Sequence, residues 1–188
     1  LRNGKSPGED NILNEYIKNS LPKLSRLYCK LFNKILNSSN FPEAWTTGLI
    51  VPIYKNKGDR SDCNNYRGIT LLSCLGKLFT SILNERLKQY CNVNNIISEN
   101  QAGFREKYST TDHIFSLKLL IDLFVSKKLK LFCAFIDYKK AFDLIWRSAL
   151  WHKLHDCGIY NNSKVFKIIK SMYNNIKSCV SKGGEKSN

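Results

Sequence analysis

The chain has 188 residues, of which 43% are hydrophobic and 12% aromatic, enough for one large domain or two small ones and too many for a disordered chain. Its formal net charge of +15 indicates a polyanionic partner such as nucleic acid, although lysine-rich codon bias is an alternative because the charge is spread along the chain. The chain has no run of the about 18 to 20 apolar residues that are needed to span a bilayer. The polar N-terminus lacks the apolar core of a signal peptide.

Seven cysteines are scattered along the sequence without a C-x-x-C pair, at positions 29, 63, 74, 91, 133, 157 and 179. An odd number with irregular spacing fits neither a disulfide framework nor a zinc site. We therefore expect reduced thiols and an intracellular location, in the cytoplasm and nucleus. The chain begins without methionine and ends in the loop-like SKGGEKSN, so we expect a piece of a longer reading frame.

The first 72 residues predict helices followed by a hairpin. Residues 10–19 have a helical pattern, and leucines and isoleucines at spacings of three and four predict a second helix from residue 21 to about residue 38. GLIVPIY (48–54) and YRGITLL (66–72) are short β-prone runs. The charged segment 55–65 between them predicts a long hairpin (48–72) with a basic tip, and Pro52 places the first run at an edge or bulge.

The rest of the chain predicts four helices and two strands. Apolar spacing indicates helices over residues 75–90, after Ser109, and over 146–156 and 162–174. Ser109, Thr110 and Thr111 can cap the second of these, and Asp112 is favourable in its first turn. LFCAFI (131–136) fits a strand buried on both faces, and KSCVS a last strand. The order α-α-β-β-α-α-β-α-α-β puts the chain in the α/β or α+β class.

Asp137 follows the most apolar of these runs directly. A carboxylate at the C-terminal end of a buried strand lies at the rim of a sheet, where α/β folds place ligands, and its oxygens suit Mg²⁺. The alternative is that Asp137 only caps a helix that begins near Lys139. The residues alone leave both readings open.

Several segments in order resemble reverse transcriptases of non-LTR (LINE-type) retrotransposons. AFIDYKKAFD resembles the first catalytic-aspartate motif of that family. GKSPGEDNI, WTTGLIVPIYKNKGD with NYRGITLLSCLGKLF, ISENQAGFREKYSTTDHIF, and LWHKLHDCGI with IIKSMYNNIKSCV resemble its other segments and cover nearly the whole chain. The resemblance implies a right-hand polymerase fold, with residues 1–110 as fingers and residues 111–188 as the N-terminal part of a palm.

The implied reaction is RNA-directed DNA synthesis, in which two Mg²⁺ ions (Mn²⁺ being an alternative) assist transfer of a dNTP onto a primer 3′-hydroxyl. On this reading Asp137 is the catalytic carboxylate and binds metal together with the backbone carbonyl of Tyr138. Asp143 would orient the helix start or bind a neighbouring basic group. Contacts with substrates are implied for residues of three segments. The implied nucleotide contacts are Lys55, Arg67, Tyr138, Ala141 and Phe142, and the implied template or primer contacts are Gln101, Gly103, Phe104 and Arg105. Lys57 is an alternative to Lys55, and a merely solvated hairpin is the alternative for Lys55 and Arg67.

The sequence also departs from the family pattern. It contains no G-x-x-Q-G segment after residue 179 and no [YF]-x-D-D, which provides the family's remaining metal ligands. We therefore expect this chain to be inactive alone and to need the rest of a polyprotein, with the missing palm, a thumb and in some elements an endonuclease. The expected partners are an RNA template, a DNA primer and dNTP, and no membrane. The alternatives are a non-catalytic, basic nucleic-acid-binding remnant and a group II intron-type maturase, which the motifs NYRGITLLS and STTDHIF disfavour.

Overall fold

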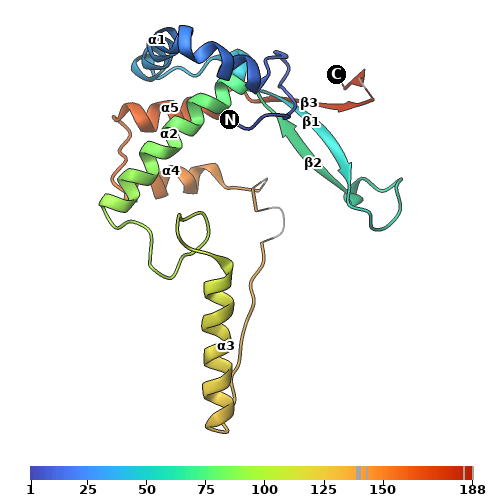
Figure 1. Cartoon of the computed structure of the whole chain (residues 1–188), viewed down its shortest axis with the longest axis vertical. Helices are drawn as coiled ribbons and strands as arrows, with labels where there is room; N and C mark the ends of the chain where they lie inside the picture. The colour runs from blue at the N-terminus through green and yellow to red at the C-terminus, as the bar shows by residue number, and fades with distance from the viewer. Residues whose placement is uncertain (139–140, 143, 184, 188) are drawn as a thin grey trace. The chain divides into compact units, whose positions relative to one another are not determined.

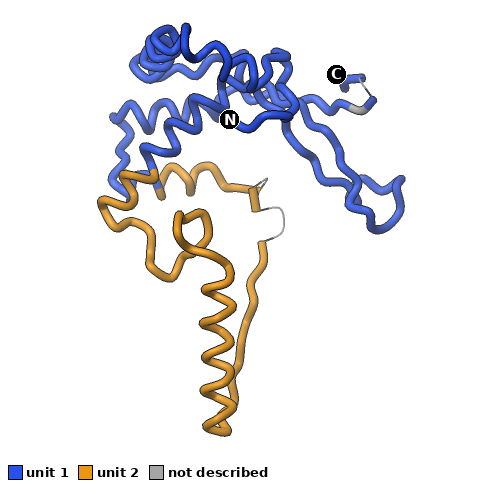
Figure 2. The backbone as a smooth tube through the Cα atoms, viewed as in Figure 1, with its two compact units in different colours: residues 1–87, 154–188 blue, residues 88–153 orange. Residues whose placement is uncertain are grey.

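A computed structural model describes residues 1–138, 141–142, 144–183 and 185–187. In these residues, five α-helices and one small sheet form two compact units (Figures 1 and 2). Unit 1 consists of residues 1–87 and 154–188, and unit 2 of residues 88–153. The expected mixture of helices and strands is confirmed, whereas the right-hand arrangement and the fingers–palm boundary near residue 110 stay predictions.

Helix α1 (Asn14–Ser38) is one continuous helix, so the prediction of two separate helices before residue 38 is wrong. Pro22 lies inside this helix and has no amide proton to donate to it. Two residues earlier, the Ser20 hydroxyl donates to the Ile17 carbonyl oxygen at 2.9 Å. The helix ends only at Ser39, whose φ of 52° is left-handed and whose amide donates to the Leu36 carbonyl at 3.3 Å.

The sheet is built around β1 (Thr47–Tyr54), which follows the short 3₁₀ turn Glu43–Trp45. It pairs antiparallel with β2 (Tyr66–Leu71), which confirms the predicted hairpin, and parallel with β3 (Lys177–Lys182). β4 (Glu185–Lys186) adds to β3, giving the order β2-β1-β3-β4. Pro52 lies beyond the last β1–β3 pair, Ile50 with Val180, so it sits where β1 has one paired neighbour, as expected for proline.

The core of unit 1 joins α1, α2 (Cys74–Val93) and α5 (Lys164–Met172). Its buried residues come from three distant parts of the sequence: Ile35 and Phe41, Phe79 and Leu83, and Ile168. Trp45 packs at its edge, with ring centroids 5.6 Å from Phe41 and 6.4 Å from Phe79. A side chain at Gly76 would place its Cβ 3.2 Å from the Cβ of Trp45, so α2 can approach the start of the hairpin closely because glycine stands there.

Unit 2 contains α3 (Thr110–Ser126), and α4 (Arg147–Asp156) begins in it. The amide of Ser109 donates to Asp112 Oδ2 at 2.9 Å, which confirms the predicted cap. None of the α3 residues is buried, and Ile114 is 67% exposed. None of the helices in the described residues is both long and apolar enough to cross a bilayer.

The strand predicted at residues 131–136 is absent, and that prediction is wrong. Residues 129–138 have no regular secondary structure. Phe132, Phe135 and Ile136 are each more than 80% exposed. A strand needs a hydrogen-bonded neighbour, and among the described residues the sheet contains only β1 to β4, so the apolar run has nothing to pair with.

The exposed apolar surface of unit 2 should make the isolated chain self-associate. We expect oligomers at micromolar concentration by size-exclusion chromatography with light scattering. Replacing Phe132 and Phe135 by serine should shift the protein toward monomer, whereas Leu27→Ser, at an exposed leucine of α1 in unit 1, should not. A monodisperse, cooperatively melting monomer of the unsubstituted chain would contradict this expectation.

Candidate functional site

Lys55 lies at the start of the hairpin tip, which internal contacts hold in one conformation. Its amide donates to the Asn65 carbonyl at 2.8 Å and its Nζ to the Asn64 carbonyl, also at 2.8 Å. Asp62 caps the short turn Cys63–Asn65 by accepting from the Asn64 amide at 2.9 Å. The Lys55 ammonium is thus fixed against the tip while staying exposed.

Arg67 is an exposed residue of β2, directly opposite Ile53 of β1. Since alternate residues of a strand share one face, Arg67 lies on the same side of the hairpin as Ile69, whose partner on β1 is Val51. This face therefore combines an arginine, whose fork suits phosphate, with a floor of β-branched side chains.

A groove of about 640 Å³ lies along this hairpin face. Its floor contains Val51, Ile53, Ile69 and Leu71, and its walls include three cations, Arg2, Lys5 and Lys77. Sequence reasoning missed these three cations, because the approach of Arg2 and Lys5 depends on how the N-terminal segment folds back and that of Lys77 on how α2 packs beside the hairpin. An apolar floor with cationic walls suits a ligand that has both flat rings and phosphates, as a nucleotide or nucleic acid does.

The N-terminal wall of the groove is tied to α1 and to the end of β2. The Gly4 amide donates to Glu15 Oε1 at 2.6 Å, and Nδ2 of the buried Asn14 donates to the Arg2 carbonyl at 2.8 Å. At Gly8 an added Cβ would lie 2.5 Å from the carbonyl carbon of Leu72, so only glycine fits there. The glycine of the SPG part of the opening motif therefore has a structural reason.

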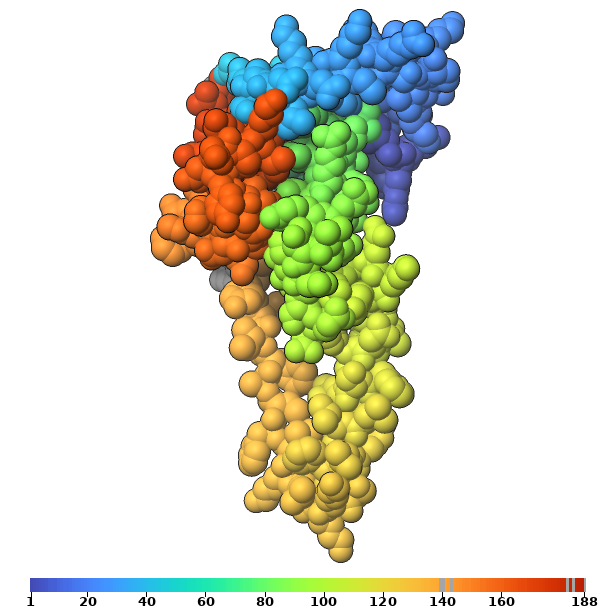
Figure 3. All heavy atoms as spheres, turned by 90° about the vertical axis from the view of Figure 1, so that its left-hand side faces the viewer, coloured from blue at the N-terminus to red at the C-terminus, as the bar shows by residue number. Residues whose placement is uncertain are grey.

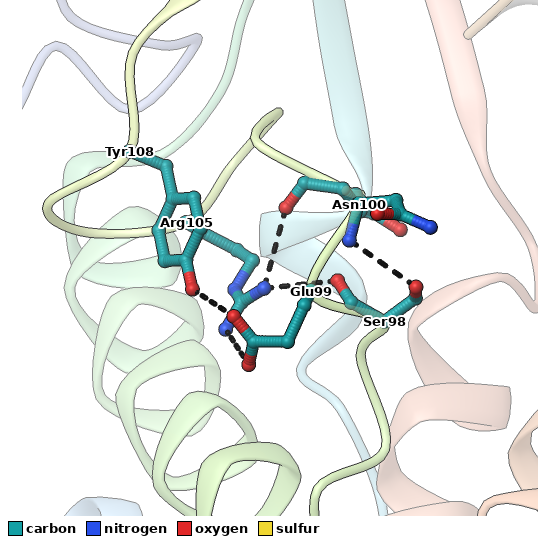
Figure 4. Close-up of polar contacts among 6 residues, drawn as sticks. Ser98, Glu99, Asn100, Arg105 and Tyr108 are labelled. Carbon is teal, nitrogen blue, oxygen red and sulfur yellow. Dashed lines mark hydrogen bonds and ion pairs between the residues drawn. The ribbon is translucent and has the colours of Figure 1, made fainter. Parts of the chain in front are cut away.

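In unit 2, Arg105 holds together the loop of residues 98–108 (Figure 4). Its guanidinium donates to the Ser98 carbonyl at 2.9 Å and to Glu99 Oε1 at 3.3 Å, and it lies 4.0 Å from the ring centroid of Tyr108. The Tyr108 hydroxyl donates to Glu99 Oε2. Only 14% of the Arg105 side chain is exposed, so this guanidinium is occupied by its own loop.

These contacts shift the pKa values of two side chains of the loop, Glu99 and Tyr108. The hydrogen bond from Tyr108, and then that from Arg105, lowers the pKa of Glu99. The same bond to Glu99 raises the pKa of Tyr108. Both shifts favour the charge state in which tyrosine donates and glutamate accepts, so the loop should keep its contacts across neutral pH.

The loop presents Phe104 outward and places it against Phe142. Phe104 is 86% exposed and has a φ of 62°, a left-handed conformation that is rare for a bulky residue. Its ring meets that of Phe142 edge-on, with centroids 6.3 Å apart. Gln101 Nε2 donates to the Gly103 carbonyl at 3.3 Å. The structure therefore brings together two predicted contact segments, 101–105 and 141–142.

Asp137 and Tyr138 lie in the irregular segment that precedes Phe142, and both are exposed. Ala141 is exposed in a turn. Asp143 and the helix start near Lys139 lie outside the described residues, so the capping alternative for Asp137 stays open. Lys55 and Arg67 belong to unit 1, and the other predicted site residues belong to unit 2.

The described residues do not form a complete Mg²⁺ site. Among them, no group of three or more acidic, histidine or cysteine side chains lies close enough to share a metal ion. Asp137 and the Tyr138 carbonyl would provide two oxygens, whereas Mg²⁺ requires near-octahedral coordination. Asp137 can serve as one ligand of such a site but cannot make it alone.

The Glu15–Gly4 contact should make the groove wall sensitive to acid. Hydrogen bonding from the Gly4 amide lowers the pKa of Glu15. A lowered pKa means that the contact stabilises the segment above the usual glutamate range and is lost as pH falls through the folded-state value. We expect exchange of the Gly4 amide, corrected for its intrinsic pH dependence, to speed up several-fold on acidification. Glu15→Gln should abolish this dependence, and an unchanged profile in that variant would contradict the assignment.

Tyr108→Phe should loosen the 98–108 loop without unfolding unit 2, because it removes one hydroxyl donor and keeps the ring. Hydrogen exchange should speed up at the amides of Gln101 and Arg105, which donate to Ser98 and Ala102 carbonyls. The matched control is Tyr16→Phe, at an exposed tyrosine of α1. Equal exchange in the two variants would show that the Tyr108 hydroxyl does not support the loop.

Comparison with known proteins identifies the family. The family described as reverse transcriptase (RNA-dependent DNA polymerase) matches residues 53–187, a span that includes every predicted site residue. A probable RNA-directed DNA polymerase from transposon BS of Drosophila melanogaster is 35% identical over 154 residues, covering 80% of this chain and 17% of the relative. The RNA-directed DNA polymerase from mobile element jockey of Drosophila funebris is 31% identical over 185 residues, covering 98% and 20%.

The chain thus spans about a fifth of the length of these relatives. A third relative, a probable RNA-directed DNA polymerase from transposon X-element of Drosophila melanogaster, is 31% identical over 155 residues, covering 81% of this chain and 17% of the relative. The resemblance to polymerases of non-LTR retrotransposons is confirmed by these matches. The chain belongs to the reverse transcriptase (RNA-dependent DNA polymerase) family.

Proposed function

We propose that this chain supplies the nucleotide-binding hairpin and one catalytic carboxylate of a retrotransposon RNA-directed DNA polymerase. In this proposal, residues 1–110 act as fingers and residues 111–188 as the first part of the palm. The substrates are an RNA template, a DNA primer and dNTP, and the remaining palm and thumb come from other parts of a longer polyprotein. The family match over residues 53–187, which includes both the hairpin arginine and Asp137, carries the proposal.

The hairpin face supports a role in holding the incoming nucleotide. Lys55 and Arg67 are exposed cations, and Arg67 shares its face with the apolar floor of the groove. Arginine can contact two phosphate oxygens at once, while lysine acts as a point charge. We assign the triphosphate to these two residues and the neighbouring template strand to the groove with its walls of Arg2, Lys5 and Lys77.

The Phe104–Phe142 contact supports a role near the sugar and the primer–template. We assign Phe142 to the nucleotide sugar, where its bulk would exclude a 2′-hydroxyl, and the backbone at Tyr138 and Ala141 to the nucleotide phosphates. Gln101, Gly103 and Phe104 would contact template or primer. Arg105 would act by holding their loop, because its guanidinium is already bonded to Ser98 and Glu99.

Magnesium ions, when bound, would neutralise the charge of the transferring phosphate. Of the groups such ions need, the described residues offer the carboxylate of Asp137 and the carbonyl of Tyr138. The 188 residues contain no [YF]-x-D-D pair. We therefore propose that the chain does not polymerise DNA by itself and that further carboxylates of the longer protein complete the centre.

A chimera tests this proposal directly. The 188 residues would replace the matching segment of the Drosophila funebris jockey polymerase, and extension of a primer on an RNA template would be measured. Asp137→Asn should lower the rate by at least about 100-fold, the order seen when a charge-stabilising group is removed from an active site. The matched control is Asp122→Asn, which removes an exposed carboxylate paired with Lys118 on α3. Equal rates for the two variants would refute a catalytic role of Asp137.

Two observations favour one second candidate, a basic nucleic-acid-binding remnant without chemistry: the net charge of +15, and the lack among the described residues of a side-chain group that could hold a metal ion. The chimera separates the two functions. An inactive chimera that still binds RNA, with an affinity that Asp137→Asn leaves unchanged, would favour the remnant.

A further inference from the structure

Helix α1 carries a row of four exposed cations on one face: Lys23, Arg26, Lys30 and Lys34. We call this row the α1 stripe. Steps of three, four and four residues in a helix of 3.6 residues per turn keep these side chains within about 80° of one another. The row runs about 16 Å along the helix axis, at a rise of about 1.5 Å per residue. Its regular spacing distinguishes it from charge that is merely scattered over the surface.

The α1 stripe has no neutralising partners nearby in the sequence or among the described residues. Residues 16–42 contain no aspartate or glutamate. The ion pairs between described residues use other cations, such as Lys88 with Glu106 and Lys177 with Glu43. Four neighbouring positive charges repel one another, and an anion along the row would relieve that repulsion.

The row continues from α1 onto α5. Asn37 lies one step beyond Lys34 on the same face, and its Oδ1 accepts a hydrogen bond from Lys164 Nζ at 2.7 Å. Lys164 is the first residue of α5, which packs against α1 in unit 1. Figure 3 shows α1, in blue, lying across the orange-red α5. A fifth ammonium group thus extends the stripe across two helices that are fixed to each other by the core.

The α1 stripe is separate from the hairpin groove. None of its four residues lines that groove, whose cations are Arg2, Lys5 and Lys77. On the opposite side of α1, Ile17 and Ile35 are buried, so the stripe faces away from the core. It therefore forms a second cationic surface, which none of the predicted site residues uses.

We propose that the α1 stripe binds the phosphodiester backbone of single-stranded RNA. Its four positions are all long cations, so it suits contact with successive phosphates and not the reading of bases. The choice of RNA as the ligand rests on the proposed function, which brings a long RNA strand to the chain. The inference that the stripe contacts phosphates does not depend on that function. The surface would hold the strand away from the hairpin, independently of sequence.

The test measures binding of a fluorescent single-stranded RNA to the full chain across a salt series. Lys23, Arg26, Lys30 and Lys34 would be replaced together by glutamine, which keeps helix propensity. Since each phosphate contact on a single strand contributes about 0.7 to the slope of log K against log salt, losing four should flatten that slope by about 3. We also expect affinity at low salt to fall at least tenfold.

The matched control removes the same charge elsewhere. Lys88, Lys118, Lys177 and Lys186 are each already paired with a carboxylate, and their replacement by glutamine should change slope and affinity little. Circular dichroism would verify that both variants keep their helices. A second variant, with the three stripe lysines changed to arginine, should retain full binding, because it keeps every charge.

Three outcomes would overturn the proposal: equal weakening by the stripe and control variants, loss of binding in the arginine variant, or stripe-dependent binding to phosphatidylserine vesicles without any to RNA. The last would identify α1 as a membrane-surface helix. Asp137 is unchanged in all these variants and no synthesis is measured. If the α1 stripe does not bind RNA, the polymerase proposal is still tested separately by the chimera. If the chimera is inactive, phosphate binding by the stripe is unaffected.

Discussion

The aromatic core behind the hairpin is the constraint on which the rest of unit 1 depends. Phe41 and Trp45 precede β1, Phe79 lies on α2, and Ile168 lies on α5, yet they pack into one cluster. Two hydrogen bonds reinforce the same junction: the Phe41 amide donates to Ser171 Oγ at 2.9 Å, and the Thr46 hydroxyl to the Asn175 carbonyl at 3.2 Å. The position of β1, and with it of Arg67 and the groove, follows from this packing.

The two units place contrasting demands on the sequence. Unit 1 buries an apolar core between three helices and can hold cations at defined positions on its surface. Unit 2 leaves the apolar residues of α3 and of the segment before Asp137 exposed. Its order comes instead from polar contacts inside one loop, where Arg105 joins two carbonyls, a carboxylate and an aromatic ring. The predicted aspartate thus lies in an exposed segment without regular secondary structure.

Local features were predictable from the sequence, and features that need distant partners were not. The turn residues of segment 55–65 predicted the hairpin, and the residues around Ser109 and Asp112 predicted the start of α3, because each feature depends on a few neighbouring residues. The apolar run 131–136 has the composition of a strand, but composition provides no neighbour to pair with. The folding of residues 1–6 onto the hairpin depends on Glu15, Asn14 and Gly8, whose contacts no periodic pattern encodes. The site residues were named from the family motifs, and their roles stay predictions.

The parallel pairing of β1 with β3 has a consequence for synthesis on the ribosome. β1 ends at Tyr54, and its partner begins only at Lys177. At about 5–20 residues per second, translating the intervening chain takes on the order of ten seconds. During that time β2 can cover one edge of β1, while the other edge remains open to any strand it meets. Contacts this distant in sequence also slow folding. A chaperone that shields the nascent hairpin should therefore raise the yield of folded protein more than one that acts after release.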